Sequence, residues 1–390
     1  MTAGYADCAV TISKYKFASA EPNERPLRYR LDRLIRNLAM RVISALAPDI
    51  AAPEADPRGR ALQRILLVRA NFRIGNVILA LPALAAFRKN FPHAKIDFVG
   101  SPISRLLFQN QPFDEHYDTP RRFPRVLWEY AILIRRLRAQ RYDLALDVSC
   151  SQSGLASVII GWSGARSRAG CAGKWDRLMN FRVAKLSEIN KYRKLTEFLR
   201  ALGLDGIDEV GRLKFSAAEL NTGHAALENF AGNETSPQVG VFVGGRKLRG
   251  KRWPLQNFIE VVVGLTQKGY RVVTFVGPEE GDIADELKRV LGSGAPIVFE
   301  PALRKFAAMV AHLDLFICCD SGPMHLACAV GVRVLAIFRE RDVARWAPPA
   351  TAARTVSAAD DVSPGAVLTA ALEELARAPA QPAGNLVKNI

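Results

Sequence analysis

From residue 64 onward, short runs of apolar residues alternate with longer segments in which apolar residues recur every three or four positions. The short runs are typical of buried parallel strands, and the longer period is typical of amphipathic helices. The predicted strands are 63–69, 95–100, 142–148, 239–243, 271–276, 296–299, 315–319 and 332–338. The predicted helices are 76–90, 126–140, 217–230, 256–268, 282–291, 303–311 and 323–330. This alternation predicts an α/β protein with doubly wound parallel sheets.

The pattern is interrupted twice. Pro82 lies inside the first predicted helix and should kink or split it. A stretch rich in turn-forming residues at 231–237 breaks the alternation, which then restarts. We therefore expect two Rossmann-like domains that face each other across a cleft at the carboxyl ends of their strands. The expected units are an N-terminal extension at 1–60, a first Rossmann-like domain at 61–225, a second Rossmann-like domain at 236–355 and a C-terminal helix and tail at 356–390.

The N-terminal extension contains one clear helical pattern, between Pro26 and Pro48. Its apolar residues keep to one helical face, and five arginines supply the polar side: Arg28, Arg30, Arg33, Arg36 and Arg41. A basic amphipathic helix of this kind can lie on an anionic membrane surface, or it can dock on the globular body. The pattern alone leaves both interpretations open.

The composition of the 390 residues, with 49% apolar and 24% charged residues, excludes disorder over the whole chain. No apolar run is long enough to span a membrane, and the first residues lack a secretory pattern, so we expect a cytoplasmic protein. The six cysteines show no metal-ligand spacing. The formal net charge of +16 favours anionic partners.

Two basic clusters stand out. Residues 121–141 hold seven arginines against one acid, Glu129, and form either a solvated face or a surface for an anion. The run 246–252 carries five positive charges directly after a predicted strand. Nucleic acid is not the expected partner, because the basic residues are not interleaved with stacking aromatic residues. A nicotinamide-dependent oxidoreductase is disfavoured because the loop 69–76 lacks the G-x-G-x-x-G pattern.

The sharpest local signal is a strand-to-helix turn at 319–327. The predicted strand ends at Asp320, a tight turn follows, and Pro323 occupies the first helical turn. The free backbone N–H groups of 322–325 and the helix dipole then form a site for a phosphate. Asp320 cannot bind phosphate and is expected to accept hydrogen bonds from sugar hydroxyls. The alternative is that Asp320 and Ser321 only cap the helix.

Other residues are expected at the same cleft. Gly244 and Gly245 allow a ligand to approach the backbone closely, and Lys251 is a point charge suited to a diphosphate. Glu279 follows a strand at the place where Rossmann units hold a ribose. On the other domain, polar residues cluster before the first helix and suit an anionic acceptor sugar: Arg69, Asn71 and Arg73.

Together these motifs resemble glycosyltransferase family 9, the ADP-heptose:lipopolysaccharide heptosyltransferases. The matching segments keep the family's order over roughly residues 64–350 and are 74–84, 142–147, 251–254, 276–279 and 320–327. The resemblance implies a GT-B fold with an ADP-heptose donor on the C-terminal domain and a lipid-linked acceptor on the N-terminal domain. It also implies donor-binding roles: Lys251 for the phosphates, Glu279 for the ribose and Asp320 for the donor sugar. The backbone of one segment would form the diphosphate cradle: Ser321, Gly322, Pro323, Met324 and His325.

One position departs from the family. Asn76 stands where the heptosyltransferases carry an aspartate, the implied general base, and an amide cannot accept a proton near neutral pH. Three interpretations stay open. The base has moved, with Asp147 as the strongest other carboxylate; or Asn76 orients the acceptor while donor departure dominates the barrier; or the protein binds sugars without transferring them.

The sequence therefore predicts an inverting glycosyltransferase that moves a heptose-like sugar to a lipopolysaccharide core or related glycan. It would work as a peripheral protein on the cytoplasmic face of the inner membrane. Because the chain has no D-x-D run, neither a metal nor any cofactor besides the nucleotide sugar is expected. The alternative is a catalytically silent relative that binds a sugar or a nucleotide.

Overall fold

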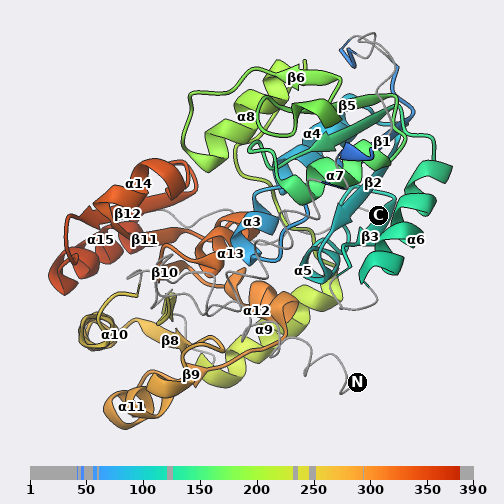
Figure 1. Ribbon diagram of the computed structural model, residues 1–390. Helices are drawn as coiled ribbons and strands as arrows, with labels where there is room; N and C mark the ends of the chain where they lie inside the picture. The colour runs from blue at the N-terminus through green and yellow to red at the C-terminus, as the bar shows by residue number, and fades with distance from the viewer. Residues whose placement is uncertain are drawn as a thin grey trace.

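The computed structural model describes residues 42, 45–47, 56–58, 61–120, 126–231, 236–245, 252–292 and 294–377. Two six-stranded sheets, each flanked by helices, make up the two halves of the molecule (Figure 1). Every strand pairing in both sheets is parallel. The predicted α/β architecture of two doubly wound sheets is therefore confirmed.

The N-terminal sheet has the strand order β3-β2-β1-β4-β5-β6. Its strands are β1 (Arg64–Val68), β2 (Lys95–Gly100), β3 (Glu115–Asp118), β4 (Leu144–Asp147), β5 (Ser167–Cys171) and β6 (Phe181–Val183). The chain runs from β1 outward to β3 and then returns to the other side of β1 as β4. The topological switch point, where ligands bind in such sheets, therefore lies between β1 and β4.

The C-terminal sheet repeats this topology with the order β12-β11-β10-β7-β8-β9. Its strands are β7 (Gln238–Phe242), β8 (Arg271–Phe275), β9 (Ile297–Val298), β10 (Leu315–Cys319), β11 (Val334–Arg339) and β12 (Ala353–Ala358). The corresponding switch point lies between β7 and β10. Both candidate sites thus sit where an open parallel sheet forms a crevice.

The helices connect these strands. They are α3 (Ile74–Ile78), α4 (Leu81–Asn90), α5 (Pro102–Leu107), α6 (Val126–Ala139), α7 (Gly154–Trp162), the 3₁₀ helix η2 (Asp176–Leu178), α8 (Lys191–Ala201), α9 (Ala217–Ala231), α10 (Leu255–Gln267), α11 (Gly281–Leu291), α12 (Leu303–Val310), α13 (Gly322–Val330), α14 (Glu340–Trp346) and α15 (Pro364–Ala376). Pro82 lies in the first turn of α4, directly after the break that separates it from α3. The predicted split at this proline is confirmed.

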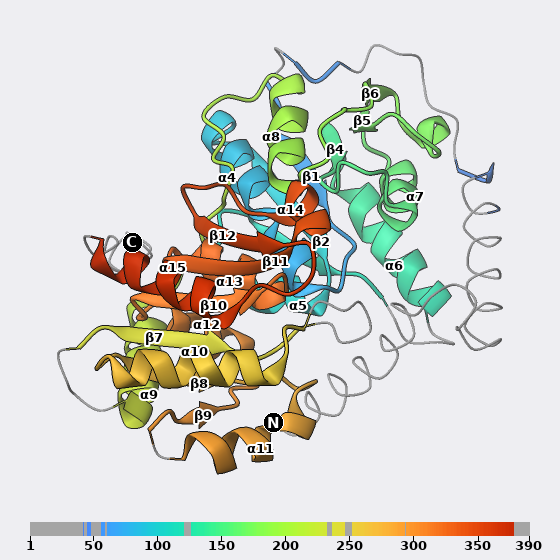
Figure 2. The same ribbon diagram turned by 90° about the vertical axis from the view of Figure 1, so that its left-hand side faces the viewer.

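Helices cover both faces of the C-terminal sheet. α10 and α15 pack together on one face, in front of the sheet in Figure 2, and α9, α12 and α13 pack on the other. α9 contacts β8 and α12, so it lies with the C-terminal sheet although the expected boundary at 225 falls inside it. α15 and the end of β12 also pack in this half, beyond the expected boundary at 355.

The two halves share an apolar core. One cluster of buried residues runs from Leu67 and Phe98 of the N-terminal sheet to Phe275 and Phe316 of the C-terminal sheet, and Phe215 lies in the connection. Because this core is continuous, the two domains bury apolar surface against each other.

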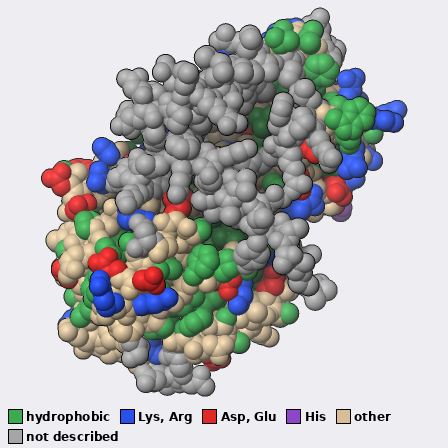
Figure 3. Space-filling view, turned by 60° about the horizontal axis from the view of Figure 1, so that its bottom comes forward, with side chains coloured by type: hydrophobic (Ala, Val, Ile, Leu, Met, Phe, Trp, Pro, Cys, Tyr) green, Lys and Arg blue, Asp and Glu red, His purple; other side chains and the backbone are tan. Residues whose placement is uncertain are grey.

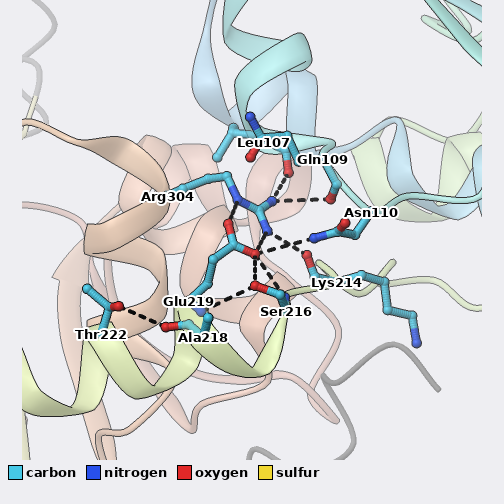
Figure 4. Close-up of polar contacts among 9 residues, drawn as sticks. All are labelled: Leu107, Gln109, Asn110, Lys214, Ser216, Ala218, Glu219, Thr222 and Arg304. Atoms are coloured by element: carbon cyan, nitrogen blue, oxygen red, sulfur yellow. Dashed lines mark hydrogen bonds and ion pairs between the residues drawn. The ribbon is translucent and has the colours of Figure 1, made fainter. Parts of the chain in front are cut away.

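A polar cluster also joins the domains (Figure 4). Arg304 of α12 donates from Nε to Glu219 Oε1 at 2.5 Å and from Nη2 to Oε2 at 2.7 Å. Its Nη1 donates to the backbone oxygen of Leu107, at the end of α5, at 2.8 Å. The guanidinium stacks over Phe215, with its carbon 4.7 Å from the ring centroid. Arg304 therefore connects three segments that are far apart in the sequence.

The N-terminal extension contributes little to the described structure. The helix predicted between Pro26 and Pro48 lies almost wholly outside the described residues, although Ala47 is buried beside Val158 and Leu178. None of the helices within the described ranges is both long and apolar enough to cross a bilayer.

Candidate active site

The two switch points meet where α3, which follows β1, packs against α13, which follows β10. Figure 1 shows these two helices side by side between the sheets. A Cβ on Gly75 would lie 2.5 Å from His325 Cδ2, and a Cβ on Gly322 would lie 3.1 Å from Ile74 Cβ. The first distance is a clash and the second is tighter than an ordinary contact, so the two glycines allow this close approach. The two strongest motifs of the sequence are thus neighbours in space.

Asn76 belongs to a hydrogen-bonded loop at this contact. Its Nδ2 donates to Asn71 Oδ1 at 3.3 Å, and the same oxygen accepts from the backbone N of Arg73 at 3.0 Å. The Nε of Arg69 donates to the backbone oxygen of Asn76 at 2.9 Å. The structure therefore brings together the four residues that the sequence analysis singled out in this loop.

Asp147 lies across the switch point, at the end of β4, and is 1% exposed. Its two oxygens accept from the backbone N of Ser149 at 2.8 Å and of Ser153 at 2.9 Å. Burial raises the pKa of Asp147, although the bonds from Ser149 and the charge of Arg69 oppose the shift. Both oxygens are thus occupied in shaping the loop after β4. Each oxygen keeps a second lone pair, so a role as proton acceptor depends on an acceptor hydroxyl reaching this buried carboxylate.

Cations from both domains gather beside this loop. The side chain of Arg69 is 9% exposed, and burial lowers its pKa, whereas the charge of Asp147 raises it. Lys191, at the start of α8, has a pKa lowered by burial and by nearby positive charges, which belong to Arg345, Lys194 and Arg69. Arg345 comes from α14 of the other domain. A cluster of like charges at a partly buried contact is suited to an anionic group.

On the donor side, Ser321 is the N-cap residue of α13, but its side chain makes no capping hydrogen bond. Its buried Oγ has no hydrogen-bond partner within the described structure. The interpretation that Ser321 only caps the helix is therefore wrong. A buried hydroxyl without a partner at a helix N-terminus, where backbone N–H groups are also free, is an arrangement that accommodates a phosphate. Asp320 is 9% exposed and precedes this turn.

His325 has a different place from the one expected for a donor-binding side chain. It is 4% exposed, and its Nδ1 lies 2.5 Å from the hydroxyl of Tyr192, a residue of α8. Burial raises the pKa of Tyr192 well above its ordinary value, so the phenol stays protonated in this hydrogen bond. The imidazole is thus used in the contact between the domains and is not available as a donor-binding side chain.

The loops after β7 and β8 are fixed by an acid that the sequence analysis did not select. Glu280 is 3% exposed and accepts from Arg252 Nη2 at 2.9 Å and from the backbone N of Gly277 at 3.1 Å. A Cβ on Gly244 would lie 2.9 Å from Glu280 Cδ. The side chain of Glu279 is exposed at the tip, where the sequence placed the ribose contact. Lys251 lies outside the described residues.

Two pockets border the site. A small one is lined by Asp320 together with Arg252, Arg339 and Asp342. A larger one, of about 670 Å³, opens between the start of α8 and the segment from α14 to β12. Asn190 donates across this larger pocket to the backbone oxygen of Ala347 at 2.9 Å. None of the predicted site residues lines the larger pocket. Within the described part of the chain, no group of three or more His, Cys, Asp or Glu side chains could hold a metal ion.

Comparison with known proteins identifies the family. The sequence model described as glycosyltransferase family 9 (heptosyltransferase) matches residues 130–375. The chain belongs to glycosyltransferase family 9. It is 24% identical over 288 residues to lipopolysaccharide heptosyltransferase 3 of Escherichia coli, covering 70% of this chain and 83% of that protein. The K12 strain's protein of that name is 26% identical over 290 residues.

Solved structures of other family 9 proteins share the fold. The family 9 glycosyltransferase of Veillonella parvula gives a TM-score of 0.70 at 19% identity, covering 80% of this chain and 97% of that one. The ADP-heptose LPS heptosyltransferase II of Escherichia coli gives 0.65 at 20% identity, covering 80% and 98%. The GT-B fold predicted from the resemblance is therefore confirmed.

Four charged residues that the sequence did not single out lie beside the predicted site residues because of the fold: Lys191, Lys194, Arg345 and Glu280. A signal for Lys191 existed in the basic stretch around α8, but nothing in that stretch distinguished one lysine from another. Asn76 is held in the loop described above, where its amide donates to Asn71.

Proposed function

We propose that this family 9 protein is an inverting glycosyltransferase that transfers a heptose-like sugar from ADP-heptose to a lipopolysaccharide core or related glycan. The named relatives support this reaction class. The observation that carries the proposal is the pairing of two features at one contact: the N-terminus of α13 with its unpartnered Ser321 hydroxyl, and the cationic cluster around Arg69.

The donor would bind to the C-terminal domain. The backbone N–H groups at the start of α13, which belong to Gly322, Met324 and His325 because Pro323 has none, would hold the diphosphate together with the ammonium of Lys251. These groups would stabilise the negative charge that the diphosphate gains as it leaves. Asp320 would accept from donor sugar hydroxyls, and Glu279 would contact the ribose.

The acceptor would bind to the N-terminal domain, where Arg69 and Lys191 suit a carboxylate or phosphate on an anionic sugar. Its hydroxyl would attack the anomeric carbon from the side opposite the diphosphate. The new C–O bond forms as the bond to the diphosphate breaks, which inverts the anomeric centre. The hydroxyl proton must pass to a base. We propose Asp147, whose raised pKa makes it a better proton acceptor than an ordinary aspartate.

Asn76 favours a second candidate, a silent relative that binds the nucleotide sugar without transferring the sugar. Calorimetry with ADP, ADP-heptose and other nucleotide sugars tests binding. Release of ADP in the presence of a lipid A-type acceptor tests transfer. Binding together with acceptor-dependent ADP release supports the transferase. Binding without release supports the silent relative, and no binding of any nucleotide would contradict both.

We further propose that the protein works at the cytoplasmic face of the inner membrane, because the expected acceptor is a glycolipid. The basic helix predicted between Pro26 and Pro48 would contribute to that association through its arginines. Vesicle binding of the full chain that falls as salt rises is the expected result. Salt-insensitive binding would favour a helix docked on the body.

A further inference from the structure

Among the described residues, no element covers the outer face of α6, where apolar side chains are exposed. Trp128 is 72% exposed, the highest value for a large hydrophobic side chain in the described structure, and Ile132 is 38% exposed. On the opposite side of the helix, Leu133 and Leu137 are buried against the N-terminal sheet. Single exposed apolar side chains are normal on a protein surface, whereas adjacent ones that form a patch mark an interaction site, and Trp128 and Ile132 are adjacent on this helix face.

Arginines surround these apolar residues. At 100° per residue, Trp128, Ile132 and Arg135 lie along one line of the helix, with Arg136 on one side of it and Arg138 on the other. All three arginines are exposed, and across the described ranges none has a carboxylate within ion-pair distance. Glu129 is the one acid in α6. We call these five residues, Trp128, Ile132, Arg135, Arg136 and Arg138, the α6 face.

The α6 face begins at the functional edge of its domain. α6 follows β3, and Thr119, just beyond β3, donates its backbone N to Gly100 O at 2.7 Å at the carboxyl end of β2. Tyr130, in the first turn of α6, donates its hydroxyl to Pro120 O at 3.2 Å. Trp128 therefore lies near the carboxyl edge of the sheet, the edge that also carries Arg69 and Asp147. Figure 3 shows hydrophobic side chains beside basic ones at the right-hand side of the molecule, where α6 lies in Figure 1.

We propose that the α6 face docks on an anionic lipid bilayer. Tryptophan prefers the boundary between headgroups and acyl chains, and an isoleucine beside it adds apolar contact. The arginines at the flanks, which have no carboxylate partner among the described residues, match anionic headgroups. A nucleic acid would use the arginines but leaves Ile132 without a role, since its surface offers phosphates rather than an apolar layer. Docking this face would bring the acceptor edge of the domain to the membrane, a consequence that rests on the proposed function.

Co-sedimentation of the full-length protein with vesicles tests the proposal. Vesicles of phosphatidylethanolamine and phosphatidylglycerol are compared with vesicles of phosphatidylcholine. Arg135→Glu should lower the affinity for the anionic vesicles about 25-fold, at about fivefold for each unit of charge. Trp128→Ser should lower it about tenfold or more, since the side chain loses its apolar contact.

Matched variants on the C-terminal domain control for charge and exposure. Arg289→Glu makes the same charge change at an exposed site of α11, and Phe299→Ser removes a side chain that is 52% exposed. Neither should change vesicle binding by more than about twofold, an allowance for the general charge effect. Equal losses in Arg135→Glu and Arg289→Glu would mean that net charge alone attracts the protein, and would overturn the proposal.

Three further results would overturn the proposal. The first is that the wild-type protein does not bind anionic vesicles, and the second is that both α6 variants keep wild-type affinity while Arg33→Glu abolishes binding. The third is that a DNA or RNA duplex binds more tightly than the vesicles and loses this binding in the α6 variants. Calorimetry with ADP on each variant separates this proposal from the proposed function. Retained ADP binding with lost vesicle binding supports the α6 face. Absence of ADP binding in the wild-type protein would contradict the donor site and leave the vesicle result to decide on the surface.

Discussion

Arg304→Ala is the substitution for which the structure gives the clearest magnitude. The guanidinium makes five hydrogen bonds, two to Glu219 and one each to the backbone oxygens of Leu107, Gln109 and Lys214. Removing one partner of a buried ion pair costs about 3–5 kcal/mol. The side chain of Glu219 is 29% exposed and keeps its hydrogen bonds from Ser216, so water and Ser216 offset part of this free-energy cost. We expect the free energy of unfolding to fall by about 2–4 kcal/mol.

Thermal unfolding followed by calorimetry measures this effect. For a chain of this size, the expected loss lowers Tm by about 2–5 °C. Arg105→Ala is the matched control, because Arg105 also pairs with a carboxylate, Asp118 at 2.9 Å, but both side chains are at least 40% exposed. It should cost at most about 1 kcal/mol. If Arg304→Ala and Arg105→Ala melted at the same temperature, the reasoning that Arg304 joins the domains would be refuted.

The pH dependence offers a second test of the same pair. Burial opposes ionisation of Glu219, but the bonds from Arg304 and Ser216 outweigh it and lower its pKa below the ordinary value of 4.5. The pair therefore contributes stability above pH 4.5 and loses it as the pH falls through the lowered pKa. The difference in Tm between the wild-type protein and Arg304→Ala should shrink on the acid side of that pH. A difference that stays constant down to the acid transition would contradict the assignment.

Three other predictions concern the site. Lys251→Ala should weaken ADP binding tens-fold or more in calorimetry, because a charge-assisted contact to a diphosphate is lost; unchanged affinity would place the cradle elsewhere. Asp147→Asn should abolish acceptor-dependent ADP release with donor affinity intact, whereas Asn76→Asp should give at most a modest gain; full activity in Asp147→Asn would rule out this base. Gly75→Ala should destabilise the protein by about 1–3 kcal/mol through overpacking against His325, whereas Gly281→Ala, with nothing within 4 Å, should not; equal Tm values for the two would argue against a tight α3–α13 contact.

The sequence by itself determined the central strands and the principal motifs. β1, β7, β8 and β10 are apolar runs, and a fully buried parallel strand requires such a run whatever surrounds it. The break at Pro82 followed from the missing N–H of proline. The family followed from motifs whose order along the chain survives low identity.

The outer strands were decided by tertiary structure. β3 reads EHYD and β5 reads SRAGC, and neither has the apolar or β-branched residues that predict a strand locally. These segments are extended because the neighbouring strand offers a full row of backbone hydrogen-bond partners. Helices then cover the side chains of the added strands. β6, with three residues, is set by its pairing with β5 alone.

The candidate site also combines residues that the sequence identifies with residues that only the tertiary structure brings in. The turn at Asp320 and the loop before Asn76 are local, since their backbone geometry and chemistry are written in adjacent residues. Glu280 and Arg304 could not have been singled out, because their partners lie 28 and 85 residues away in the sequence. Sequence periodicity reports contacts within a few residues along one helix or strand, whereas these side chains acquire their roles from segments that only the folded topology brings together.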